Sequence, residues 1–509
     1  MVSQCTALIH NIMERTILIC FAAYTLLLFV VMWLTGRRGA RGNEAFFRAG
    51  RRSPWPVVAY GMIGASLSGV TFMSVPGDVL ANRWFYMPMV LGYVLGYATI
   101  ALVLLPLYYR LNLTSIYSYL GQRFGLRSEK TGALFFLISR LLGSALRMYL
   151  VVFVLYEFVF KYWGVPFWVP AVVFIVIILL YTFAGGIKTV VWTDTLQTTF
   201  LLLAAVATVV AILNSLDMNI ADLLKVSSDE GYTQMFNTDP MAPKFWVKQV
   251  LAGMFITITM TGLDQDMMQK NLTCKTLRDA QKNVLTSSLL FIAVNIIFLC
   301  LGAALIAYAS QTGFELPVGA NGQVVGDKIF PSIAFSLSGF TAVCFVLGIV
   351  AAGYSSADGT LTALTTTFCY NFLGFGKHEK SGERPNAKGE LTVRRLVHVG
   401  FALLYLLIII AFRPFHSDSL ITIIFDVAGF TYGPLLGLYA YGLFTRRGVS
   451  DRWVPFVAVA SPVICYILKL FSPRWFGYTF GFEILLLNGL ITFGLLWLGG
   501  FKSSKETRE

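Results

Sequence analysis

Residues 60–77 read YGMIGASLSGVTFMSVPG, and this stretch decides the fold. It lies in an apolar run near 55–80, long enough to cross a bilayer, because about 20 helical residues span the roughly 30 Å hydrocarbon core. A helix that faces lipid would carry Leu and Val at its centre. Small and hydroxyl residues stand there instead: Gly64, Ser66, Ser68, Gly69 and Thr71. We therefore expect a membrane helix that is interrupted halfway across the bilayer.

The whole chain has the composition of a membrane protein. Of its 509 residues, 57% are hydrophobic and only 13% are charged, whereas soluble domains carry about 25% charged residues. The mean hydropathy is +0.71. Lipid offers no partners for backbone polar groups, so spanning segments must satisfy their own hydrogen bonds. These numbers predict an all-α integral membrane protein.

Apolar runs of spanning length recur about thirteen times. They lie near 14–35, 55–80, 84–109, 131–160, 166–184, 189–214, 247–267, 283–309, 331–372, 395–412, 420–444, 453–471 and 481–500. The runs at 283–309 and 331–372 are long enough to include tilted or interfacial turns. The run at 16–34 follows no basic stretch and has no clear small-residue cleavage site. We therefore expect it to be a retained helix rather than a signal peptide.

The basic residues predict the orientation of the chain. The net charge of +13 gathers in the connectors after the first, third, seventh, ninth and eleventh runs, and in the C-terminal tail. The basic residues assigned to the connector after the seventh run are Lys270, Lys275, Arg278 and Lys282. Cytoplasmic loops carry such an excess, so the N-terminus is expected outside and the C-terminus in the cytoplasm. Because no exposed basic domain is visible, we expect no nucleic-acid partner.

A second run repeats the pattern of the first interrupted helix. Residues 253–262 read GMFITITMTG, five spans after the first stretch. A pair of interrupted spans at corresponding positions of two halves points to a transporter's binding site. Close packing of helices through small residues is the alternative.

Two carboxylates fall inside apolar runs. Asp358 lies in AAGYSSADGTLTALTTT (351–367), and Asp194 lies in GGIKTVVWTDTLQ (185–197). Ionised groups within the bilayer are costly and need partners. We favour an ion-binding role for both over a structural pairing.

Two arginines share one face of the run at 131–160. Arg140 and Arg147 are seven residues apart, which places them on the same side of a helix. Arg147 lies near the middle of the membrane and needs an anion. That anion is either an internal Asp or the carboxylate of a substrate, and the sequence leaves both open.

Several motifs occur in a characteristic order along the chain. They are Gly185-Gly186 followed by residues 192–197 (WTDTLQ), Leu263-Asp264-Gln265 with Gln269-Lys270, residues 351–356 (AAGYSS), and residues 433–437 (GPLLG) with 442–444 (GLF). Together they resemble the sodium:solute symporter family, whose members have the LeuT-type fold. The resemblance covers residues 52–447.

The resemblance implies a domain organisation. It predicts an N-terminal helix with a basic connector (1–52), a transport core built as a 5+5 inverted repeat (53–447), and two further helices with a cytoplasmic tail (448–509). The protein would lie in the inner or plasma membrane.

The resemblance also implies a sodium site, with Na⁺ as the coupling ion. Its ligands would be the carbonyl groups of Gly64, Leu67 and Ala352 and the hydroxyl groups of Ser355 and Ser356. Some similar transporters bind a further sodium with the acid that matches Asp194 and with hydroxyls one turn beyond the Ser pair. Here those positions hold Asp358 and Gly359, so Asp358 would either replace a ligand or carry a proton.

Solute residues follow from the same comparison. Ser68, Thr71 and Arg147 are similar to the Ser, Thr and Arg that hold the carboxylate in sialic-acid members. The run after Trp84 departs from those members, because it has no Gln or Asn to offer an amide.

The sequence therefore predicts a sodium-coupled secondary active symporter that imports a small polar solute by alternating access. A carboxylated solute such as a sialic acid is favoured, and a neutral sugar, an amino acid or a monocarboxylate is the alternative. A channel or a non-transporting sensor is less favoured. An enzyme is not expected, because the chain has only four His residues and contains neither an HExxH nor a GxSxG motif. No obligate protein partner is expected.

Overall fold

The computed structural model describes residues 2–37, 43–319, 322–375, 387–413 and 420–501. Helices run through nearly all of these residues, so the all-α prediction is confirmed. The connector charges predicted at Arg38, Arg41, Lys377, Lys380 and Arg384 lie outside the described residues, as do those of the tail at Lys502, Lys505 and Arg508.

The first half of the chain contains the elements up to the long connector after α10. They are α1 (Val2–Arg37), α2 (Asn43–Arg48), η1 (Ala49–Arg51), α3 (Trp55–Ser66), α4 (Gly69–Asn82), α5 (Met87–Thr99), η2 (Ile100–Leu104), α6 (Leu105–Arg110), α7 (Ser118–Arg123), α8 (Leu126–Phe158), η3 (Phe160–Trp163), α9 (Trp168–Gly185), α10 (Ile187–Ser215) and, within that connector, α11 (Ile220–Asp229).

The second half begins with another interrupted helix. Its elements are α12 (Trp246–Thr257), η4 (Ile258–Gly262), α13 (Gln265–Asn271), α14 (Leu277–Thr312), α15 (Gly326–Leu337), α16 (Gly339–Thr367), η5 (Phe368–Phe372), α18 (Ala387–Ala411), α19 (Leu420–Phe444), α20 (Val454–Phe476) and α21 (Ile484–Leu498). Two short strands, β1 (Gly448–Val449) and β2 (Gly500–Phe501), pair antiparallel.

The first interrupted helix is present where the sequence predicts it. α3 ends at Ser66 and α4 begins at Gly69, with a bend of 61° between them. Leu67 and Ser68 have extended backbones, with ψ angles of 98° and 169°. The hydroxyl and glycine residues of this stretch thus surround a genuine break in a membrane helix.

The second interruption lies just after the predicted stretch. α12 and η4 together are bent by 71° against α13, and the break falls at Leu263 and Asp264. The Asp264 side chain accepts a hydrogen bond from the backbone N–H of Met267, which caps the N-terminus of α13.

The predicted run at 331–372, which is long enough to include a turn, is broken within the described structure. Ser338 has an extended backbone that separates α15 from α16. Ser338 and Thr341 form a reciprocal capping box, which satisfies the first N–H groups of α16 and makes a separate helix start favourable.

Eight helices of the described chain are long and apolar enough to cross a membrane, or ten if each bent pair forms one span. Large apolar side chains on the perimeter are well exposed, such as Leu102 (72%), Leu289 (64%) and Leu396 (74%). Lipid rather than water suits such a surface. The total of thirteen spans stays a prediction.

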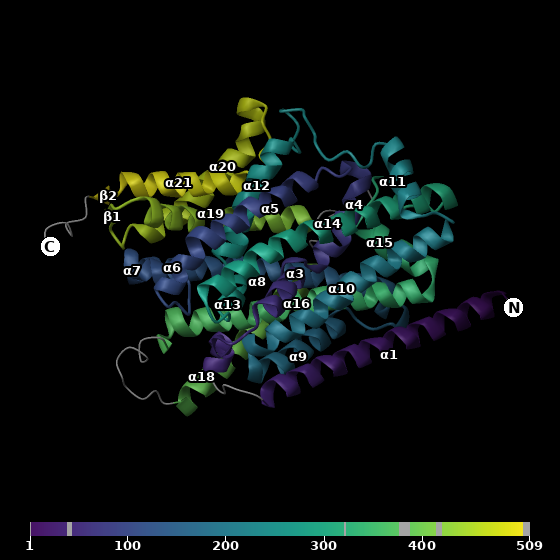
Figure 1. The fold of residues 1–509 in the computed structure, drawn as a ribbon, viewed down its shortest axis with the longest axis horizontal. Coiled ribbons are helices and arrows are strands. Elements are labelled where there is room, and N and C mark those ends of the chain that lie inside the picture. Colours follow the sequence, from purple (N-terminus) through teal and green to yellow (C-terminus); the bar gives the residue numbers. More distant parts are fainter. Residues whose placement is uncertain (1, 38–42, 320–321, 376–386, 414–419, 502–509) are drawn as a thin grey trace.

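The central helices position the site. α10 packs against both α16 and α3, and α8 packs against α16 and α19. In Figure 1, α1 runs along one edge of the bundle, and α20 and α21 lie at the opposite edge. The break between α3 and α4 therefore lies in the interior, beside α8, α10 and α16.

Candidate functional site

The break in the first interrupted helix provides free carbonyl groups. The last carbonyls of a helix have no N–H partner within it, so the end of α3 leaves oxygen atoms available near Gly64 and Leu67. Both residues are buried. The N–H of Gly64 donates to Thr198 Oγ1 of α10 at 3.0 Å, which fixes this end of α3. A carbonyl-rich helix end of this kind can hold a small cation.

α16 brings hydroxyl groups against the same helices. Ser355 and Ser356 are buried, as is Ala352 one turn before them. Ser356 Oγ has no hydrogen-bond partner among the described residues. A buried hydroxyl without a partner is costly, so a ligand such as a cation suits it. The assignment of Gly64, Leu67, Ala352, Ser355 and Ser356 as sodium ligands stays a prediction, and the helices that carry them are in contact.

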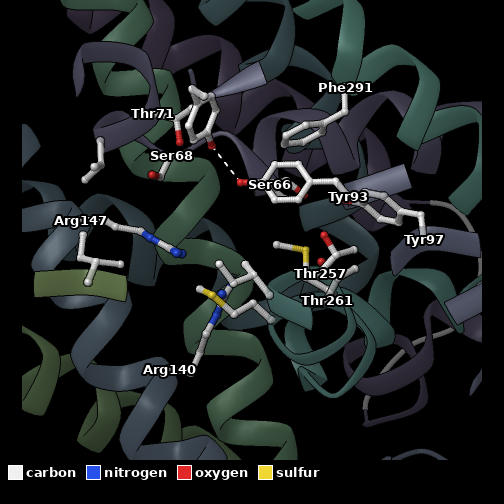
Figure 2. Close-up of a pocket in the computed structure, with 17 residues that line it drawn as sticks. Ser66, Ser68, Thr71, Tyr93, Tyr97, Arg140, Arg147, Thr257, Thr261 and Phe291 are labelled. Atoms are coloured by element: carbon white, nitrogen blue, oxygen red, sulfur yellow. Dashed lines mark hydrogen bonds between the residues drawn. The ribbon is translucent and has the colours of Figure 1, made fainter. Parts of the chain in front are cut away.

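A cavity opens beside this break. Figure 2 shows Ser68, Thr71 and Arg147 around it, which are the three residues predicted for the solute. The remaining wall is aromatic and hydroxylated and includes Tyr86, Tyr93, Tyr97, Phe291, Thr257 and Thr261.

The two arginines of α8 have different surroundings. Arg140 is buried and contacts Asp266, with Asp264 Oδ2 3.6 Å from its Nη1. The half-buried Arg147 lies at the cavity (Figure 2) and forms no ion pair within the described part of the chain. The structure thus assigns an internal Asp pair to Arg140, while Arg147 is available for an anion in the cavity.

The prediction that Lys270 lies in a connector is wrong. Lys270 was counted as a basic residue of the seventh connector, but it is 1% exposed and lies in α13. Its Nζ lies 2.8 Å from Asp194 Oδ2 and 3.5 Å from Asp266 Oδ1. The spacing of Asp266 and Lys270 by four residues was the available signal for an ion pair on a helix.

The two membrane carboxylates singled out in the sequence have distinct partners. Asp194 accepts a hydrogen bond from Ser355 Oγ at 2.6 Å and pairs with Lys270. Asp358 accepts hydrogen bonds from neutral groups: Tyr181 Oη at 2.9 Å, Thr193 Oγ1 and Gln197 Nε2, both at 3.3 Å, and its neighbouring Gly359 N–H at 2.6 Å. Their role as a second cation or proton site stays a prediction.

Ion pairs join Arg140, Asp194, Asp264, Asp266 and Lys270, and Asp358 interacts electrostatically with Asp194 and Lys270. We call these six residues the charge cluster. Each is at most 3% exposed. In the sequence, Asp264 was quoted only as part of a motif and Asp266 was not named, and neither was predicted as a site residue. Tyr432 Oη donates to Asp264 at 2.5 Å. Four carboxyl groups face two basic ones, so the cluster favours a further positive charge nearby.

Comparisons with known proteins agree with this arrangement. The model of the sodium:solute symporter family matches residues 46–449. The sodium/sialic acid symporter NanT of Aliivibrio fischeri is 25% identical over 469 residues, covering 89% of this chain and 88% of that protein. The sodium/sialic acid symporter SiaT of Proteus mirabilis is 25% identical over 437 residues, covering 82% of each.

A solved structure shares the fold. The substrate-bound, outward-open state of a Na⁺-coupled sialic acid symporter superposes with a TM-score of 0.79 at 22% identity, covering 96% of this chain and 99% of the other. The predicted LeuT-type fold is therefore confirmed.

Proposed function

The chain belongs to the sodium:solute symporter family, and we propose that the solute it imports with Na⁺ is an organic acid of the sialic acid type. The single observation that carries the substrate class is the position of Arg147. Its guanidinium lies at a membrane cavity beside the hydroxyl residues Ser68 and Thr71. A guanidinium within the membrane interior calls for an anion, and a carboxylate can bind it through two parallel hydrogen bonds.

The relatives favour the same class of solute. NanT and SiaT are both sodium/sialic acid symporters, and a sialic acid carries one carboxylate on a polyhydroxylated ring. Hydroxyl and phenol groups around the cavity, including Thr257, Thr261 and Tyr93, can accept and donate hydrogen bonds to such a ring.

Sodium would bind between the end of α3 and α16. The carbonyl groups near Gly64 and Leu67 and the unpartnered hydroxyl of Ser356 are hard, neutral oxygen ligands. Neutral ligands suit a monovalent ion that must bind and then leave. Because α4 continues from the same break into the cavity wall, sodium at one side of Leu67 would organise Ser68 and Thr71 at the other.

We further propose the orientation that the basic connectors predict, with the N-terminus outside and the C-terminus in the cytoplasm of an inner or plasma membrane. In Figure 1, α1 begins at one end of the bundle and β2 lies at the other end, which suits an odd number of spans.

A monocarboxylate is the second candidate. Ile256, Met260 and Phe291 give part of the cavity wall an apolar surface, which fits a short acid with an apolar tail. Such a solute would still use Arg147.

Uptake into proteoliposomes tests the proposal. The purified protein is assayed with radiolabelled N-acetylneuraminic acid, its methyl ester, N-acetylmannosamine, an amino acid and propionate, each with external Na⁺ or K⁺. We expect saturable, sodium-dependent uptake of the free acid and none of the ester. Equal uptake of ester and acid, or uptake of the neutral sugar alone, would overturn the carboxylate assignment.

A further inference from the structure

The charge cluster already holds a cation at Asp194. The ammonium of Lys270 lies 2.8 Å from Asp194 Oδ2, and both side chains are 1% exposed. We propose that this ammonium takes the place of a second sodium ion, so that one Na⁺ accompanies each solute molecule. The proposal rests on the sodium-coupled function above and specifies its stoichiometry.

Asp194 is the carboxylate that faces the predicted sodium site. Its Oδ1 accepts the hydrogen bond of Ser355 on α16, while its Oδ2 faces Lys270 on α13. The two oxygens of one carboxylate thus connect the sodium-binding helix to a fixed positive charge. A sodium ion and an ammonium are both compact monovalent cations, so they compete for the same carboxylate oxygen.

Gly359 provides the space for the ammonium. A Cβ atom built on Gly359 would lie 2.8 Å from Lys270 Nζ and closer still to Asp266 Oδ1, and both distances are shorter than real Cβ contacts. The absence of a side chain at this position therefore admits the ends of both Asp266 and Lys270. It also removes any side-chain oxygen that could help to bind a sodium ion there.

Asp266 holds the ammonium in this position. Its Oδ1 lies 3.5 Å from Lys270 Nζ, one turn earlier on the same helix, and its Oδ2 contacts Arg140 of α8. Lys270 is thereby held between Asp194 and Asp266 without access to water. An ammonium on its own side chain remains in the protein throughout the cycle, so it adds nothing to the transported charge.

The consequence is electrical. One Na⁺ and one singly charged carboxylate carry no net charge across the membrane together. A second sodium would make each cycle carry one net positive charge. The response of uptake to membrane potential therefore reports the number of Na⁺ ions transported with each solute molecule.

The first experiment uses the unmodified protein in proteoliposomes. Sodium-dependent uptake of N-acetylneuraminic acid is measured with and without an inside-negative potential set by valinomycin and a K⁺ gradient. We expect uptake that is hyperbolic in Na⁺, with a Hill coefficient of about 1, and the same rate at both potentials. A coefficient of about 2 with faster uptake at negative potential would overturn the proposal. Absence of any sodium-dependent uptake would instead refute the proposed function.

The second experiment removes the ammonium that pairs with Asp194. Lys270→Met, alone and with Gly359→Ser to introduce a hydroxyl, should make uptake sigmoidal in Na⁺ and faster at negative potential. Lys270→Arg keeps a cation and serves as the matched control, with hyperbolic dependence retained. Lys270→Met uptake that stays hyperbolic and insensitive to potential would contradict the proposal. If these variants do not fold, the measurement on the unmodified protein decides.

Discussion

Ser355 Oγ donates a 2.6 Å hydrogen bond to Asp194 Oδ1, which joins α16 to α10. The hydroxyl predicted to bind sodium is therefore in direct contact with the buried charge cluster. A hydroxyl oxygen that donates to a carboxylate keeps its own lone pairs and can still coordinate a cation. If sodium binds at the end of α3 as predicted, one side chain connects that ion to the charge cluster.

Ser356→Ala should weaken sodium binding with little effect on folding. The Ser356 hydroxyl has no partner in the described structure, so its removal breaks no internal hydrogen bond. We expect the half-saturating Na⁺ concentration for uptake to rise about tenfold, equivalent to about 1.4 kcal/mol. The matched control is Thr362→Val, which removes another buried, unpartnered hydroxyl of α16. An equal shift in both variants would argue against a sodium ligand at Ser356.

Arg147→Met should abolish tight binding of an anionic solute. Removal of one partner from a buried charge pair costs about 2–5 kcal/mol, so the KM for the acid should rise at least about 30-fold. Stabilisation of the purified protein by Na⁺ alone should persist. Arg147→Lys should recover only part of the affinity, because an ammonium lacks the planar bidentate geometry. Unchanged uptake in Arg147→Met would disprove the substrate contact.

Arg140→Met should mainly damage stability. This residue contacts Asp266 and lies near Asp264, so its loss leaves Asp264 without a counter-charge and Asp266 with Lys270 alone. Breaking such a pair costs about 3–5 kcal/mol. In thermal unfolding in detergent, Arg140→Met should melt well below both the unmodified protein and Arg147→Met. Adding Asp266→Asn should restore part of the loss, and an undiminished melting temperature for Arg140→Met would contradict the pairing.

Sodium and solute should strengthen one another's binding. Linkage requires that Na⁺ changes the solute Kd by the same factor as the solute changes the sodium Kd. Calorimetric titration of each ligand with and without the other measures both factors. If the solute affinity were identical in Na⁺ and K⁺, sodium binding at the break near Leu67 would not be coupled to solute binding in the cavity.

The sequence predicted those features whose signal is local. Glycines and hydroxyls clustered in a long apolar run indicated the break at Leu67, and Arg147 was recognised because a mid-membrane cation requires an anion. Both follow from the cost of polar groups in lipid, which any short window of sequence reveals.

Other features depend on contacts that are distant in sequence. Lys270 closely follows the polar residues 264–266 and was assigned to a connector, because only the packing of α13 against α10 brings Asp194 beside it. The length of the run at 331–372 indicated a turn within it, but not its position at Ser338, because the apolar character continues on both sides of that residue. The domain boundaries at 52 and 447 stay predictions.

Accumulation of solute against its gradient is the most direct test of sodium coupling. Proteoliposomes with equal N-acetylneuraminic acid inside and outside receive an inward Na⁺ gradient, and internal solute is followed over time. Coupling predicts that the internal concentration rises above the external one and falls back when a sodium ionophore collapses the gradient. An internal concentration that never exceeds the external one would contradict the claim that sodium entry drives uptake.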